Sequence, residues 1–268
     1  MRSAEVTAEG DRIRWVELPG VQGHTEPARV YLHGLGASSP AYFADVAGRA
    51  PLAGRRSLLL DLMGHGISDR PEHFSYSLEA HADAVAAALR AAGAAGAPGT
   101  AQGAEVVAHS MGGSVAVVLA ARHPDLVSRL VLVDANLDPL RPERGALGSR
   151  DIASYDEEEF LAGGWAEVRE RAGEHWWSTM RLAGRRALHR SAVCLVRGST
   201  PTMRELLLGL RVPRAYLHPE ADGPLPGAAG LAAAGVSVVA VPECGHNVML
   251  DNPEGFVRAT AAALAYEG

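Results

Sequence analysis

Residues 105–113, which read Glu-Val-Val-Ala-His-Ser-Met-Gly-Gly, constrain the fold of this chain more than any other stretch. The β-branched residues Val106 and Val107 predict a strand, and the apolar run 114–121 predicts a helix close behind it. Ser110 lies at the apex between them, and its neighbours are small, as a crowded strand-to-helix turn requires. Two interpretations follow: Ser110 is an ordinary helix cap, for which serine is a preferred residue, or its side chain is presented at the edge of a sheet.

Short apolar runs alternate with helical patterns along most of the chain, and this alternation indicates a parallel sheet buried on both faces. Residues 4–18 read instead as a hairpin with a turn at Glu9-Gly10-Asp11, which we expect at an antiparallel edge of the sheet. Further strands are predicted at 28–32, 57–62, directly before Ser110, and at 129–133, 214–217 and 236–241. Helices are predicted at 40–49, 77–90, 114–121, 226–234 and 253–266, and 91–103 is expected to be a surface connection.

The alternation stops between residues 136 and 211, where three tryptophans and an acidic run (156–159) replace it. We interpret this segment as an inserted helical cap. The predicted fold class is therefore α/β, with a mostly parallel twisted sheet and helices on both faces. Residues 1–135 and 212–268 are expected to form the core domain, and 136–211 the cap.

Composition excludes several functional classes. The net charge of -6 and the pI near 6.0 leave no basic footprint for nucleic acid or an anionic membrane. All 25 basic residues are arginine, so a Schiff-base or P-loop lysine is absent. The two cysteines have no metal-ligand or disulfide spacing, and the histidines form no metal-binding pattern. The amino-terminal residues resemble no signal peptide, so we expect a cytoplasmic protein without a membrane partner.

Two other loops are expected at the same sheet edge as Ser110, because the carboxyl ends of parallel strands lie together. One carries His246, whose imidazole could accept the serine proton. The other is His33-Gly34-Leu35-Gly36, where the glycines allow the backbone to turn. The backbone N–H groups of Leu35 and Met111 could then stabilise an oxyanion. Taken singly, a loop histidine is more often a surface residue, and the glycine loop is equally compatible with an ordinary strand-end turn.

Four motifs in this order resemble the α/β-hydrolase family. They are His-Gly-x-Gly (33–36), Asp-x-x-Gly-His-Gly-x-Ser (61–68), Ala-His-Ser-Met-Gly-Gly (108–113) and Gly-His-x-x-x-x-Asp-x-Pro-Glu (245–254). The likeness spans nearly the whole chain except the cap. It departs from the family's Gly-x-Ser-x-Gly pattern only in Ala108, which is still small. The family members that use a carboxylate nucleophile are poor matches, since the residue at the turn is Ser110.

This resemblance implies a serine hydrolase with Ser110 as nucleophile and His246 as general base. Asp222, in His-Pro-Glu-Ala-Asp (218–222), falls at the position of the family's triad acid, although Pro219 replaces the expected glycine. Asp134, at the end of the strand after the serine turn, is the alternative acid, and Glu220 is a further rival. No cofactor is expected.

The expected substrate is a small to medium, partly apolar ester, thioester or similar acyl compound. We assign His33, Gly34, Trp176 and Met249 to substrate binding, with Met111 beside them, whereas His65, Asp61 and His109 are expected to have structural roles. Two alternatives stay open: carbon–carbon bond hydrolysis, lyase, cyclase or acyl-transfer chemistry at the same site, or a non-catalytic ligand-binding protein on the same fold. The sequence is compatible with a monomer or a homodimer.

Overall fold

The computed structural model describes residues 1–21, 26–94 and 103–266. In this part of the chain, eight strands form one sheet in the order β1-β2-β4-β3-β5-β6-β7-β8. The hairpin pairs antiparallel with the sheet through β2 and β4, and every pair from β4 to β8 is parallel. The strands are β1 (Arg2–Glu5), β2 (Arg12–Leu18), β3 (Arg29–Leu32), β4 (Ser57–Asp61), β5 (Ala104–His109), β6 (Val127–Val133), β7 (Arg214–Pro219) and β8 (Val236–Val241).

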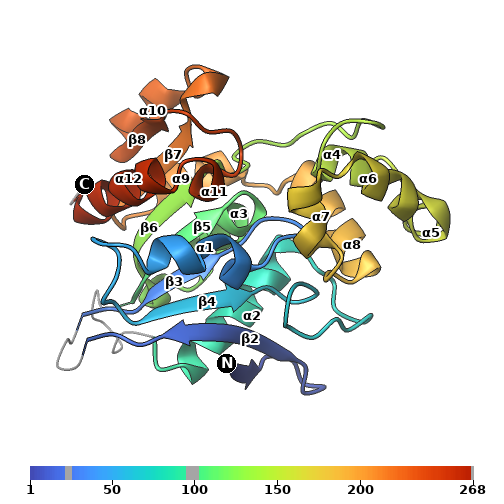
Figure 1. Ribbon diagram of the computed structural model, residues 1–268, viewed down its shortest axis with the longest axis horizontal. Coiled ribbons are helices and arrows are strands. Elements are labelled where there is room, and N and C mark those ends of the chain that lie inside the picture. The colour runs from blue at the N-terminus through green and yellow to red at the C-terminus, as the bar shows by residue number, and fades with distance from the viewer. Residues whose placement is uncertain (22–25, 95–102, 267–268) are drawn as a thin grey trace.

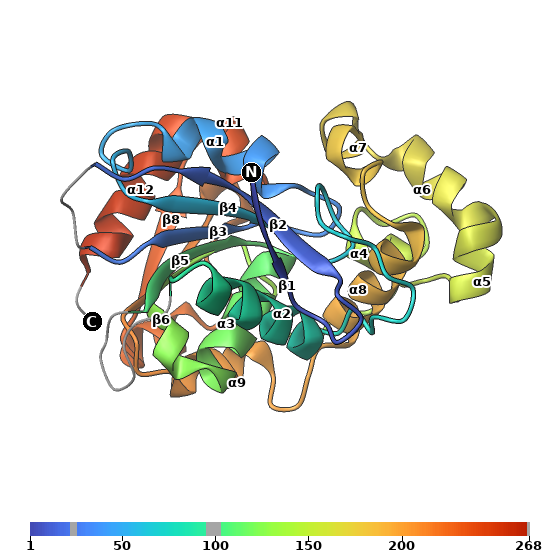
Figure 2. The ribbon, with the colours of Figure 1, turned by 90° about the horizontal axis from the view of Figure 1, so that it is seen from below.

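Helices cover both faces of the sheet, with α1, α11 and α12 on one side and α2 and α3 on the other (Figures 1 and 2). The core helices are α1 (Ser39–Ala47), α2 (Leu78–Ala91), α3 (Met111–Arg122), α10 (Ala228–Ala233), α11 (Val248–Asp251) and α12 (Pro253–Ala265). The helices between β6 and β7 are α4 (Ser149–Ile152), α5 (Glu157–Glu159), α6 (Trp165–Arg171), α7 (Glu174–Met180), α8 (Arg185–Arg197) and α9 (Met203–Gly209).

The central strands are buried on both faces, which explains their continuous apolar sequences. In β3, Val30 and Leu32 pack with α2 and α3, whereas Tyr31 packs on the other face with α1. All three side chains are fully buried. Because consecutive side chains of a strand point to opposite faces, a strand between two helical layers has no polar side. The predicted fold class is thus confirmed.

Helix ends follow local side-chain chemistry. Ser77 precedes α2 and its Oγ accepts a hydrogen bond from the backbone N–H of Ala80 (3.1 Å). Thr202 and Glu205 form a capping box at the start of α9. The helix that was predicted from residue 114 begins at Met111, directly after the serine turn. Of the connection predicted at 91–103, residues 95–102 lie outside the described part of the chain.

The helices α4 to α8 lie beyond the end of the sheet toward which β4 points (Figure 1). They form a separate layer over the carboxyl ends of the parallel strands, as a cap does. Helix α9 differs from them, because it lies against α3 on one face of the sheet (Figure 2). No helix among the described residues combines the length and apolar character needed to cross a membrane.

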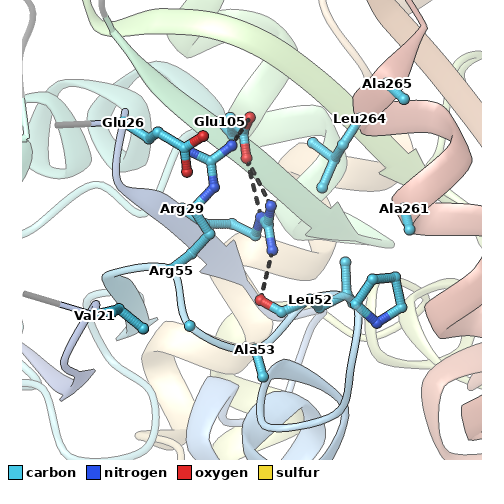
Figure 3. A pocket seen from close by; sticks show the side chains of 12 residues that line it. Val21, Glu26, Arg29, Leu52, Ala53, Arg55, Glu105, Ala261, Leu264 and Ala265 are labelled. Carbon is cyan, nitrogen blue, oxygen red and sulfur yellow. Dashed lines mark hydrogen bonds and ion pairs between the residues drawn. The ribbon is translucent and has the colours of Figure 1, made fainter. Parts of the chain in front are cut away.

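A buried ion pair joins β3 and β5 at the opposite end of the sheet, beside a cavity of about 470 Å³ (Figure 3). Arg29 donates from Nε and Nη2 to Glu105 Oε2 (3.1 and 2.9 Å), and from Nη1 to the carbonyl oxygen of Leu52 (3.0 Å). Arg55 lies 3.3 Å from the other carboxylate oxygen of Glu105. The side chains of Arg29 and Glu105 are only 5% and 9% exposed, so each charge depends on its partners.

Replacing Arg29 with methionine is therefore expected to lower the free energy of unfolding by about 3 kcal/mol, because it leaves a buried carboxylate with Arg55 alone. The double variant Arg29→Met/Glu105→Leu removes both charges and should recover most of this loss. Arg90→Met, at an exposed pair with Asp125, is the matched control and should change stability by less than about 1 kcal/mol. Urea unfolding measures all three, and an Arg29→Met protein as stable as the control would contradict the assignment.

Candidate active site

Ser110 has a backbone conformation that is rare for a residue with a side chain, with φ 52° and ψ -123°. Its N–H donates to the carbonyl oxygen of Val133 (2.9 Å), and its own carbonyl accepts from Gly113 N (2.9 Å). A Cβ at Gly112 would lie 2.5 Å from the carbonyl oxygen of His33, so only glycine fits there. The close packing of β3, β5 and α3 therefore holds the strained turn in place.

His246 forms its side-chain hydrogen bond with Asp134, whose Oδ2 lies 2.6 Å from Nδ1 of the imidazole. Asp134 directly follows β6 and has a positive φ of 43°. Its N–H donates to the carbonyl oxygen of Leu217 in β7 (2.8 Å). The bond to Asp134 leaves Nε2 of His246 available to other groups. The imidazole is 54% exposed, so this part of the site is open to solvent.

The expectation that Asp222 is the partner of His246 is not met. Asp222 lies in the exposed 3₁₀ turn Glu220–Asp222 after β7. The sheet explains the difference, because β6 is the direct neighbour of β5 and β7 is one strand further away. His109 pairs in register with Val133, so Ser110 and Asp134 are the next residues on two adjacent strands. The carboxylate beside the serine turn is therefore that of Asp134, the alternative acid in the sequence-based prediction.

His109 supports the loop that carries His246. Its Nε2 lies 2.9 Å from the backbone carbonyl oxygen of His246, and the two rings are 4.6 Å apart. The ring of His109 is buried, and burial lowers its pKa well below the usual value. The neutral imidazole thus donates from Nε2 to the loop. A packing role was expected for His109, but this bond to His246 could not be read from the sequence.

His33 orients the loop that carries Leu35, whose N–H was expected to stabilise an oxyanion together with that of Met111. The N–H of Leu62 donates to His33 Nε2 (3.0 Å), which leaves the proton on Nδ1, and Nδ1 donates to the carbonyl oxygen of Gly34 (2.7 Å). In a trans peptide the C=O and N–H point in opposite directions. The N–H of Leu35 is therefore turned away from His33. Within the described chain, neither this N–H nor that of Met111 has an acceptor.

A residue of the cap also contacts this glycine-rich loop. Trp176 of α7 donates from Nε1 to the carbonyl oxygen of Leu35 (2.9 Å). Gly36 has a φ of 68°, and a Cβ there would lie 2.7 Å from Trp176 Nε1. A side chain at this position would both strain the turn and push the indole away. The conformation of the loop is thus stabilised by two hydrogen bonds, one from His33 to Gly34 and one from Trp176 to Leu35.

A cavity of about 500 Å³ brings these groups together, a volume suited to a small or medium organic ligand. Ser110, His246, Leu35 and Trp176 all line it. The other lining residues are Gly34, Ala37, Tyr42, His109, Asn136, Leu140, Leu147, Gly148, Ser149, Arg150, Arg171, Ala172, Gly173, His175, Leu195 and Asn247.

Two of the residues expected to bind substrate do not reach this cavity. His33 is fully buried and uses both ring nitrogens within the protein. Met249 is 1% exposed and packs in the core on the α1 and α12 face of the sheet. Gly34 and Trp176, which were also assigned to substrate binding, line the cavity, and so does His175. Trp177 instead packs against Trp165, with ring centroids 5.8 Å apart.

A group of possible metal ligands lies outside the cavity. Among the described residues, Glu9, Asp11 and His73 have ligand atoms within 4.8 Å of one another. His73 Nε2 lies 3.0 Å from Asp11 Oδ2 and 3.5 Å from Glu9 Oε2, at the surface. These three residues form a polar group at the surface, away from Ser110.

Three fully buried histidines form a row that ends at the cap. The ring centroids of His33 and His65 are 5.3 Å apart, and those of His65 and His81 are 6.3 Å apart. His81 Nε2 lies 3.1 Å from Ser191 Oγ of α8. Burial lowers the pKa of His33 to about 4 and that of His65 to about 3, and it lowers the pKa of His81 well below its usual value. All three rings are neutral in the folded protein near pH 7.

The row makes folding stability depend on pH. In the unfolded chain a histidine has a pKa of about 6.5, so below this pH the unfolded state binds protons that the folded state does not. Above about pH 7 the neutral histidines do not lower the free energy of unfolding. As the pH drops from 6.5 toward 4, this free energy falls by up to about 1.4 kcal/mol per pH unit for each histidine. Urea unfolding of His81→Phe between pH 6 and 5 should show a slope smaller by about that amount. Equal slopes for the variant and the wild type would contradict the prediction.

Comparison with known proteins agrees with this architecture. A family model described as alpha/beta hydrolase fold matches residues 28–160. The chain is 37% identical to an esterase of Mycobacterium tuberculosis over 145 residues, which is 50% of this chain and 45% of the relative. It is 36% identical to 2-hydroxymuconate semialdehyde hydrolase of Pseudomonas putida over 112 residues, which is 42% of this chain and 37% of that protein. The matched segments thus span less than half of these curated relatives.

Solved structures resemble the chain over nearly its full length. A thermophilic esterase from Thermogutta terrifontis superposes with a TM-score of 0.76 at 18% identity, covering 99% of this chain and 98% of the other. An enol-lactonase from Burkholderia xenovorans gives a TM-score of 0.73 at 20% identity, with coverage of 98% and 100%. At these identities the likeness concerns the fold alone.

Proposed function

Since the chain belongs to the α/β-hydrolase fold family, we propose that it is a serine hydrolase that cleaves an ester, thioester or related acyl bond through an acyl-enzyme. The observation that carries this proposal is that Ser110 and His246 line the same cavity. Nδ1 of His246 is hydrogen-bonded to Asp134. The esterases among the similar proteins support the same reaction class. The cavity volume and its apolar walls fit a small to medium, partly apolar substrate.

In the proposed mechanism, Ser110 Oγ attacks the carbonyl carbon while His246 Nε2 accepts the hydroxyl proton. Asp134 accepts the Nδ1–H bond and stabilises the imidazolium that forms. The N–H groups of Leu35 and Met111 bind the developing oxyanion, and one such donor contributes about a hundred- to a thousandfold to the rate. His246 then protonates the leaving group. A water molecule, activated by the same imidazole, hydrolyses the acyl-enzyme.

A fluorophosphonate probe and a p-nitrophenyl ester test the nucleophile. The wild-type protein should be labelled once per chain and hydrolyse the ester, whereas Ser110→Ala should lose the label and at least about a thousandfold in kcat. Ser199→Ala, at a partly exposed serine outside the cavity, should behave as wild type. Labelling that persists in Ser110→Ala would refute the role of Ser110.

The acid is tested by a matched pair of substitutions. Asp134→Asn keeps the size of the side chain but offers the wrong hydrogen-bond partner to Nδ1, so kcat should fall by about a thousand- to ten-thousandfold. Asp222→Asn changes an exposed residue and should leave kcat close to the wild-type value. Steady-state hydrolysis of the same ester measures both, with circular dichroism as the folding control. The reverse ranking would return the acid role to Asp222.

A further inference from the structure

The cavity beside Ser110 has an uneven distribution of charge. Two arginines, Arg150 and Arg171, line it together with His175 and His246. Among the described residues, no aspartate or glutamate belongs to its lining. The chain as a whole carries a net charge of -6, so this excess of cationic groups is a local feature. Both arginines come from the segment between β6 and β7, on the cap side of the cavity.

Arg171 is held rigidly by groups behind it. Its Nε and Nη2 lie 2.9 and 2.7 Å from Asp151 Oδ2, and Nη2 also donates to the hydroxyl of Tyr155 (3.0 Å). Asp151 is 1% exposed, and its other oxygen accepts from Gly145 N (2.8 Å). The carboxylate is therefore buried in the cap and does not line the cavity, whereas Arg171 does.

This arrangement leaves one part of the guanidinium unused. Within the described chain, Nη1 of Arg171 has no hydrogen-bond acceptor. The side chain is 34% exposed, so a ligand can reach it. The hydrogen bond to Asp151 raises the pKa of Arg171, so the cation is retained. Because its orientation is already fixed, binding an anion costs Arg171 little conformational entropy.

Arg150 adds a second donor that is less firmly held. Its Nε donates to the carbonyl oxygen of Arg141 (3.0 Å), and Nη2 pairs with Glu143. This ion pair is exposed on both sides, at 39% and 59%, so it contributes little free energy and can exchange for a ligand. Its Nη1 likewise has no acceptor in the described part of the chain.

We propose that the acyl substrate carries a carboxylate, and that Arg171 and Arg150 bind it on the cap side while Ser110 attacks the acyl carbon. This inference rests on the serine-hydrolase function proposed above. Leu140, Leu147 and Leu195 supply the apolar wall of the cavity and would contact the carbon chain between the two groups. A singly charged carboxylate suits the site better than a phosphate dianion, because each arginine already shares its charge with an acidic partner.

The test compares two p-nitrophenyl esters of equal chain length, the pentanoate and the hemiester of glutarate, which differ in a terminal methyl or carboxylate. The wild-type kcat/KM should favour the hemiester by at least about tenfold, since hydrogen bonds to charged groups are the strong ones. The ratio should fall toward one in Arg150→Gln and in Arg171→Gln/Asp151→Asn, where the second change avoids a buried unpaired carboxylate. Arg181→Gln, an exposed cap arginine outside the cavity, should keep the wild-type ratio.

The outcomes separate this inference from the function on which it rests. Hydrolysis of both esters with no preference for the hemiester would overturn the carboxylate site and leave the hydrolase function intact. If neither ester is hydrolysed, calorimetric titration of the protein with glutarate, pentanamide and inorganic phosphate still tests the site. Glutarate should bind at least about tenfold more tightly than pentanamide, which has no carboxylate. Equal binding of glutarate and pentanamide, or tighter binding of phosphate, would overturn the proposal.

Discussion

The strained backbone at Ser110 is the constraint on which the rest of the site depends. A positive φ at a residue with a side chain costs about 1–3 kcal/mol, and the cost is met by close packing of β3, β5 and α3. The same packing brings the glycine-rich loop after β3 against the serine. The pairing of β5 with β6 then sets Asp134 beside it. The relative positions of Ser110, Asp134 and the glycine-rich loop thus follow from the order of the neighbouring strands β3, β5 and β6.

The sequence predicted the features that depend on local pattern. Continuous apolar runs indicated the doubly covered sheet, and small residues around Ser110 indicated the sharp turn. His246 was expected near Ser110 because strand ends meet at one edge. The choice between Asp134 and Asp222 could not be made in this way, since both follow strands that end at that edge, and only the order of strands brings one closer. The roles of His33 and Met249 were also beyond prediction, because burial depends on packing across the whole sheet.

The insertion between β6 and β7 shows how one segment can combine unlike tasks. Its interior contains a buried carboxylate, Asp151, that would be costly without Arg171. Its inner surface supplies apolar side chains and guanidinium groups to the cavity. Its helix α9 meanwhile packs on α3 of the core. The charge that faces the cavity is therefore built into the folding of the insertion, rather than added at its surface.

The hydrogen bond from Trp176 to Leu35 makes the insertion a support of the proposed oxyanion loop as well as a cover of the cavity. If the insertion lifts from the core, the glycine-rich loop loses its upper support, and the N–H of Leu35 is no longer held in place. In the proposed mechanism, such a molecule would lack one of the two donors to the oxyanion. An insertion without an indole at this position would therefore cover the cavity but leave the glycine-rich loop without this hydrogen bond.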